Sequence, residues 1–153
     1  MPIIHSKRSV YAGIDPGMSG GLVCIGPQLI VTPMPPTERD IWDWFEALPP
    51  VRLAVIEKVH SMPRQGVAST FKFGCSYGGL RMALIASKIP FQEVTPQTWI
   101  KGLGIPGKKK TESGTQWKNR LKGKAQQFFP QVGVTLKTAD ALLIARYCQK
   151  IGK

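Results

Sequence analysis

The sequence predicts an α/β fold: a five-stranded mixed sheet, with three antiparallel strands followed by two strands that alternate with helices, flanked by helices. Near the start of the chain, three short apolar runs are separated only by tight turns, which is typical of antiparallel strands. Further along, β-branched runs alternate with segments whose apolar residues recur at helical spacing. The 153 residues are enough for a single domain, 1–153, with one real core.

Composition narrows the class of protein. Hydrophobic residues make up 42% of the chain, which fits a soluble globular protein, and no apolar run is long enough to span a bilayer. The first residues lack the apolar stretch and cleavage site of a signal peptide. Cys24, Cys75 and Cys148 are odd in number and far apart, so we interpret them as reduced core thiols of a cytoplasmic protein.

The charge balance is the strongest global feature. Twenty-one Lys and Arg residues stand against nine Asp and Glu residues, a formal net charge of +12. Such an excess favours a polyanionic partner. We expect nucleic acid and no membrane partner, because no basic amphipathic helix stands alone at a terminus. The alternative is a basic surface that serves only solubility.

The first three strands are predicted at 9–14, 21–25 and 28–32. Asp15 follows the first strand directly and precedes a turn rich in Gly and Ser. The strand fixes the backbone of this acid, while its side chain remains free to reach a ligand. The alternative is an Asp that merely hydrogen-bonds its own turn.

A helix at 38–48 and a central strand at 51–57 come next. Thr37, with Asp40 three residues later, is typical of a helix N-cap and its acidic partner. The strand is a compact β-branched run, and it again ends in an acid, Glu57.

A long helix is predicted at 67–88. Its Gly74 and Gly78 lie one turn apart and leave a flat strip on which another element can approach closely. That element is either the sheet or the same helix of a second subunit, and we favour the sheet.

The following part of the chain contains a strand at 90–95, a short helix beginning at Pro96, and a basic flexible insertion and helix at 102–124. Residues 101–124 carry a net charge of +7, more than half of the excess of the whole chain. Charges of one sign repel each other without a partner, so we expect this segment to contact a polyanion. Its second half predicts a helix at about 113–129.

The last helix is predicted at 136–149, with Asp140 in its first turn, where the helix dipole alone would explain an acid. If the first and fourth strands are neighbours, Asp15 and Glu57 emerge at the same edge of the sheet, and Asp140 can lie over that edge. Three carboxylates at one rim are unfavourable unless a cation binds there. Such oxygen ligands suit Mg²⁺ or Mn²⁺, and beside a cationic segment they predict metal-assisted phosphodiester hydrolysis.

Three blocks of the sequence resemble the motifs of RuvC-like Holliday junction resolvases, which belong to the ribonuclease H-like superfamily. The blocks are Gly13-Ile14-Asp15-Pro16-Gly17, Val55-Ile56-Glu57-Lys58-Val59 and Ala139-Asp140-Ala141-Leu142-Leu143-Ile144-Ala145. The resemblance covers about residues 10–147. The small size and the lysine-rich insertion resemble the bacteriophage branch most, which would place the protein in the host cytoplasm.

The resemblance implies a ribonuclease H-like nuclease domain that acts as a homodimer on four-way DNA junctions. Each subunit would nick one strand in a reaction that needs Mg²⁺, with Mn²⁺ as a substitute and two ions at each site. Asp15, Glu57 and Asp140 match the metal-binding acids of the family.

One position departs from the family pattern. The family usually has a fourth acid, or a histidine, three residues before the last Asp, and this chain has Lys137 there. On a helix, Lys137 would lie one turn before Asp140 and on the same face. We therefore include Lys137 among the catalytic candidates, and the alternative is a side chain that faces solvent or the DNA backbone.

The DNA-contact candidates share a basic or stackable side chain near the predicted site. They are Lys58, His60, Met62, Arg64, Lys101, Lys108, Lys109, Lys110, Lys118, Arg120, Lys122 and Lys124. In the bacterial family an aromatic residue just after the Glu block wedges into the junction centre, and His60 and Met62 occupy the matching place here. A polar loop without DNA contact is the alternative.

Three rival functions remain open from the sequence. The first is a junction- or branched-DNA-binding protein with weak or no catalysis. The second is an ATP-binding module, which normally needs two such domains. The third is a related nuclease that acts on other branched DNA or hybrids.

Overall fold

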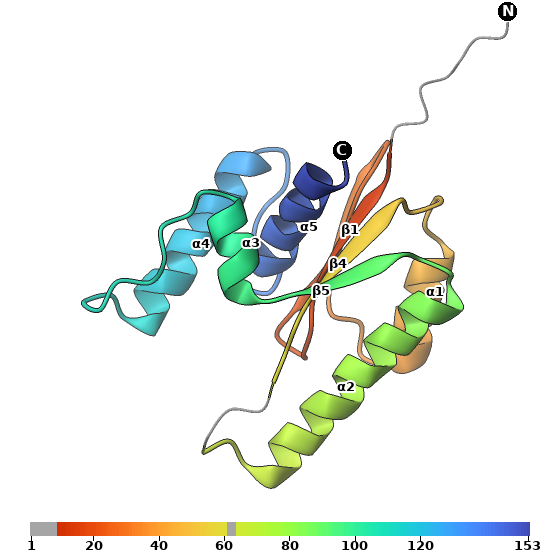
Figure 1. Cartoon of the computed structure of the whole chain (residues 1–153), viewed down its shortest axis with the longest axis horizontal. Helices are drawn as coiled ribbons and strands as arrows, with labels where there is room; N and C mark the ends of the chain where they lie inside the picture. Colours follow the sequence, from red (N-terminus) through yellow and green to blue (C-terminus); the bar gives the residue numbers. More distant parts are fainter. Residues whose placement is uncertain (1–8, 61–63) are drawn as a thin grey trace, which may run out of the picture.

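The computed structural model describes residues 9–60 and 64–153. Its strands are β1 (Tyr11–Asp15), β2 (Gly21–Ile25), β3 (Leu29–Pro33), β4 (Leu53–Glu57) and β5 (Phe91–Val94), and its helices are α1 (Glu38–Glu46), α2 (Val67–Ala86), α3 (Pro96–Gly102), α4 (Gly114–Phe128) and α5 (Ala139–Ile151). The strands form one sheet in the order β3-β2-β1-β4-β5 (Figure 1). β1, β2 and β3 pair antiparallel, whereas β4 runs parallel to β1 and β5. The predicted fold class is confirmed.

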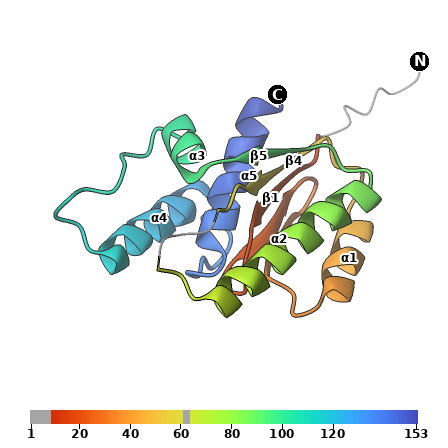
Figure 2. The same cartoon turned by 60° about the horizontal axis from the view of Figure 1, so that its bottom comes forward.

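The helices lie on the two faces of the sheet. α5 lies against β1, β2 and β4, with α3 and α4 packed against it, and α1 and α2 cover the opposite face (Figures 1 and 2). Side chains alternate between these two cores, because successive residues of a strand point to opposite faces: Val55 faces α5, and Ile56 faces α1 and α2. Within the described ranges, no helix is both long and apolar enough to cross a membrane.

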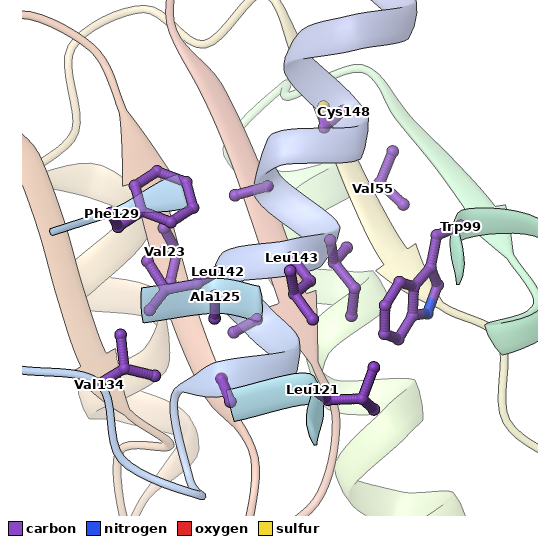
Figure 3. Close-up of a cluster of buried hydrophobic side chains, with 14 of the residues drawn as sticks. Val23, Val55, Trp99, Leu121, Ala125, Phe129, Val134, Leu142, Leu143 and Cys148 are labelled. Carbon is purple, nitrogen blue, oxygen red and sulfur yellow. The ribbon is translucent and has the colours of Figure 1, made fainter. Parts of the chain in front are cut away.

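The larger core lies between the sheet and α5. Figure 3 shows Val23 and Val55 of the sheet gathered with Leu142 and Leu143 of α5 and with Trp99 of α3. Trp99 is only 1% exposed. Its burial fixes α3 beside the end of β4, next to the predicted site.

Gly13 is the point at which α5 crosses β1. A Cβ atom on Gly13 would lie 2.6 Å from the carbonyl oxygen of Ala141 and would also overlap the backbone of Ala145. No side chain fits there, so the helix backbone rests directly on the strand. This close approach brings Asp140, the neighbour of Ala141, toward the end of β1.

The predicted N-cap at Thr37 is confirmed, and Ser113 caps a further helix. Thr37 accepts a hydrogen bond from the Asp40 amide at 3.1 Å, and Ser113 forms a capping box at the start of α4. The expected start of the last helix at 136 is wrong, because α5 begins at Ala139. Thr135 and Thr138 instead form a turn, in which the Thr135 amide donates to Thr138 Oγ1 at 3.1 Å.

The expectation that Gly74 and Gly78 pack on the sheet is also wrong. A Cβ atom on either glycine would meet open space. α2 instead packs through Leu80, Ala83 and Leu84. Cys75, on the same helix, is exposed, so the expectation of a core thiol is wrong for this cysteine, whereas Cys24 and Cys148 are buried as expected. The opposite side of α2 is a stripe of apolar and small residues that has no partner within the described part of the chain. We call it the α2 stripe, and it comprises Val67, Phe71, Gly74, Gly78, Met82 and Ile85.

Candidate active site

Sheet pairing brings the first two acids together. β1 and β4 are parallel neighbours in which Ile14 lies opposite Ile56, so Asp15 and Glu57 leave the sheet side by side at its carboxyl edge. Asp140 arrives from the first turn of α5, which the crossing at Gly13 holds over β1. All three carboxylates line one cavity of about 400 Å³, which we call the acid cavity.

The turn after β1 forms another wall of the acid cavity. Gly17 has a φ of +98°, and its carbonyl oxygen accepts a hydrogen bond from the Gly20 amide at 3.0 Å. This left-handed conformation suits glycine, and it keeps the backbone beside Asp15 compact. Phe73 from α2 and Lys118 from α4 complete the wall.

The three carboxylates are held in an environment that disfavours their charged forms. Burial, followed by the charges of Asp140 and Glu57, raises the pKa of Asp15 well above its usual value. Burial raises the pKa of Glu57 to about 7, with a smaller contribution from the charge of Asp140. Burial also raises the pKa of Asp140. Such mutual destabilisation is relieved when a cation binds between the carboxylates.

Trp99 orients one of these acids. Its Nε1 atom donates a hydrogen bond of 2.8 Å to Oε2 of Glu57, and this bond lowers the pKa of Glu57, opposing the effect of burial. One carboxylate oxygen is thereby fixed by a buried indole. Trp99 was not among the predicted site residues. Its position depends on the pairing of β5 beside β4, which brings the start of α3 to the end of β4.

Among the described residues, Lys118 is the basic residue that lines the acid cavity. Its charge lowers the pKa values of both Asp15 and Asp140. Lys137 lies in the turn just before α5, two residues before the first residue of the helix. It lines an adjoining cavity of about 430 Å³, which has Gly17 and Met18 in common with the acid cavity.

The other predicted DNA contacts are mostly exposed. Lys58, His60 and Arg64 are exposed on the link that follows β4, and Met62 lies outside the described residues. Lys101, Lys108, Lys109, Lys110 and Lys118 are exposed, whereas Lys122 and Lys124 are half-buried on α4. Of these residues, Lys118 lines the acid cavity, and the others stay candidates for DNA contact by their charge and exposure.

Arg120 has a different place. Its Nε atom and one terminal nitrogen donate to the Glu112 carboxylate at 2.8 and 2.9 Å, and its terminal nitrogens also donate to the carbonyl oxygens of Pro106 and Gly107 at 2.8 and 3.0 Å. The hydrogen bond from Arg120 lowers the pKa of Glu112 to about 2. Because these donors are engaged within the protein, the exposed lysines are the stronger candidates for DNA contact.

The carboxylate set fits a divalent cation by its chemistry. Three half-buried acids supply hard oxygen ligands, and none of them makes an ion pair within residues 9–60 and 64–153. Over the same residues, no three such side chains already stand at the spacing of a formed metal centre. Because Asp15, Glu57 and Asp140 line one cavity, they are the residues that would hold an ion.

Comparison with solved structures identifies the fold. Neither a protein-family model nor a curated protein matches this chain. Among solved structures, RuvC of Thermus thermophilus in complex with a Holliday junction substrate matches with a TM-score of 0.66 and 16% identity, covering 95% of this chain and 97% of that one. A second T. thermophilus RuvC structure matches with a TM-score of 0.61 and 17% identity, covering 94% and 97%. The chain therefore has the RuvC fold, whereas the bacteriophage branch stays a prediction.

Proposed function

We propose that this chain is a divalent-metal-dependent endonuclease that resolves four-way DNA junctions by paired, symmetric cuts. One observation carries the proposal: three half-buried carboxylates share the acid cavity, in a RuvC fold, with a lysine from a segment whose net charge is +7. Burial, and then the charges of the neighbouring carboxylates, raise the pKa values of Asp15 and Glu57. A phosphodiester substrate explains both the need for metal ligands and the basic surroundings.

In the proposed reaction, Mg²⁺ or Mn²⁺, bound as two ions, would activate water and stabilise the leaving 3′-oxygen. Asp15, Glu57 and Asp140 would hold these ions. The Trp99 hydrogen bond would keep Glu57 in a fixed orientation, so that its free oxygen faces the cavity. Water would attack the scissile phosphorus, the bond to the 3′-oxygen would break, and the products would carry 5′-phosphate and 3′-hydroxyl ends.

We propose that Lys118, and not Lys137, supplies the positive charge beside the scissile phosphate. Lys118 shares the acid cavity with the three carboxylates, whereas Lys137 lines another cavity. Its ammonium group would offset the negative charge on the phosphate oxygens as it increases in the transition state. Lys118 of α4 would then perform the role that the family gives to the fourth acid, whose place in this chain is taken by Lys137.

We also propose a homodimer that forms through the α2 stripe. Val67 is 88% exposed and Phe71 is 73% exposed, and an apolar stripe of this length is unusual on a monomer. The two open glycines at its centre would let a second helix approach closely. Sedimentation equilibrium tests this: Phe71→Glu should shift the wild-type dimer to a monomer, whereas Lys88→Glu, in the turn after the same helix, should leave the dimer intact. A wild-type monomer would contradict the interface.

Cleavage of an immobile four-way junction tests the proposed activity. In Mg²⁺, the protein should nick the junction at symmetric positions and leave linear duplex of the same sequence uncut, and Asp15→Asn should abolish the cuts. Equal cutting of flaps or hybrids would favour a related nuclease with other substrates. Tight junction binding without cleavage in Mg²⁺ or Mn²⁺ would instead indicate a binding protein.

A further inference from the structure

A second cavity, of about 690 Å³, lies between α3, the 103–113 loop and α4. We call it the α3–α4 pocket. Pro96, Ile100, Pro106 and Trp117 give it mainly apolar walls, and the exposed Lys101 and Lys108 also line it. Its volume is in the range of small-molecule and cofactor sites, and this combination of apolar walls with cations suits a planar, anionic ligand.

This pocket lies next to the acid cavity along α4. There, Lys118 lines the acid cavity and its neighbour Trp117 lines the pocket. On α3, Trp99 donates to Glu57, and the next residue, Ile100, lines the pocket. Because Trp117 and Lys118 are adjacent in the chain, a strand whose phosphate lies at the carboxylates passes close to the pocket.

The structure holds Trp117 and the pocket rim in place. The guanidinium of Arg120 lies over the Trp117 ring, 4.5 Å from its centroid, and does not itself line the pocket. The same guanidinium donates hydrogen bonds to the carbonyl oxygens of Pro106 and Gly107, two residues that line the pocket. Arg120 therefore supports the indole and the loop together, as expected for a surface on which a ligand stacks.

We infer that the α3–α4 pocket binds one unstacked nucleotide of the strand that is cut at the acid cavity, with its base against Trp117 and its phosphates near Lys101 and Lys108. The inference rests on the proposed function for the identity of the strand. Stacking on an aromatic ring accepts any base, and the apolar walls then limit the size and shape of the base that enters. The pocket would therefore contribute to the sequence preference of cleavage.

The direct test is binding of a single-stranded hexadeoxynucleotide that carries one 2-aminopurine, without metal ions, beside an abasic hexamer of equal charge. The wild-type protein should quench the 2-aminopurine and should bind the abasic hexamer about 10-fold more weakly, because the stacked base is missing. Trp117→Leu should lose this difference, and Trp117→Phe should keep most of it. Equal binding of both hexamers by the wild-type protein would overturn the inference.

A second pair of variants protects the test against misfolding of the Trp117 substitutions. Lys108 and Lys109 are both exposed, but only Lys108 lines the pocket. Lys108→Glu should therefore reduce the quenching of 2-aminopurine at saturating protein, whereas Lys109→Glu should weaken binding and leave the quenching of the bound hexamer unchanged. Identical quenching in the two variants would contradict the pocket.

Junction cleavage separates this inference from the proposed function. If the protein cuts junctions but Trp117→Leu neither changes the preferred cleavage sequence nor lowers the affinity for the hexamer, the pocket is wrong and the resolvase stands. If Trp117 carries hexamer binding but junctions are neither bound nor cut, the nucleotide pocket stands and the resolvase is wrong.

Discussion

Replacing Glu57 with Gln should stabilise the metal-free protein at neutral pH. Burial raises the pKa of Glu57 from 4.5 to about 7, so the folded protein holds a proton here that the unfolded chain releases between these two values. Stability therefore falls as the pH rises from about 4.5 to 7, and the loss remains above pH 7. At 1.36 kcal/mol per pKa unit, this penalty is about 3 kcal/mol at pH 8.

Gln removes the charge and keeps an oxygen that accepts the Trp99 hydrogen bond. In EDTA at pH 8, Glu57→Gln should therefore unfold at a melting temperature about 6–12 °C above that of the wild type, and at pH 4 the two proteins should melt together. Glu46→Gln is the control, because this exposed side chain at the end of α1 should change stability by less than about 0.5 kcal/mol.

Calorimetry with and without Mg²⁺ completes this test. Mg²⁺ should stabilise the wild type more than Glu57→Gln, because a ligand that binds only the folded state raises its stability. A Glu57→Gln protein that melts at or below the wild-type temperature in EDTA at pH 8 would refute the reasoning. It would mean that the carboxylate is adequately solvated or paired without a cation.

Three further substitutions test other parts of the site. Trp99→Phe should raise the Mg²⁺ concentration needed for half-maximal junction cleavage while junction affinity stays near the wild-type value, because the hydrogen bond that orients Glu57 is lost. An unchanged Mg²⁺ requirement would remove Trp99 from the site. Lys118→Ala should slow single-turnover cleavage by about 100-fold and Lys137→Ala by less than about 3-fold, and the reverse order would return Lys137 to the mechanism. Gly13→Ala should destabilise the protein by about 3 kcal/mol or more in urea, since the methyl group overlaps the backbone of α5, and wild-type stability would contradict that close contact.

Features that depend on local sequence could be predicted. The apolar run before Asp15 and the turn after it predict that this acid lies at the end of a strand. The β-branched run before Glu57 predicts the same for the second acid. Their pairing at one edge followed once β1 and β4 were taken as parallel neighbours, which the register of Ile14 with Ile56 shows. Helix caps such as Thr37 are also local, because the bond joins residues three positions apart.

Features that depend on tertiary packing could not be predicted in the same way. Lys118 and Lys137 are both single lysines near helices, and only the placement of α4 beside α5 brings Lys118 to the carboxylates. The start of α5 was misplaced because Thr135 and Thr138 favour a turn that the apolar periodicity does not reveal. The α2 glycines were assigned to the wrong side, because a glycine strip has the same pattern whether it faces a sheet or open space.

Resolution by paired cuts is most directly measured on a supercoiled plasmid that extrudes a cruciform. A dimer with two acid cavities should cut both strands during a single binding event. In Mg²⁺ it should therefore convert the plasmid to a linear form whose hairpin ends contain nicks that ligase seals. Asp15→Asn should leave the plasmid supercoiled. Accumulation of a singly nicked circle, or linear products with unligatable ends, would contradict the proposed resolvase.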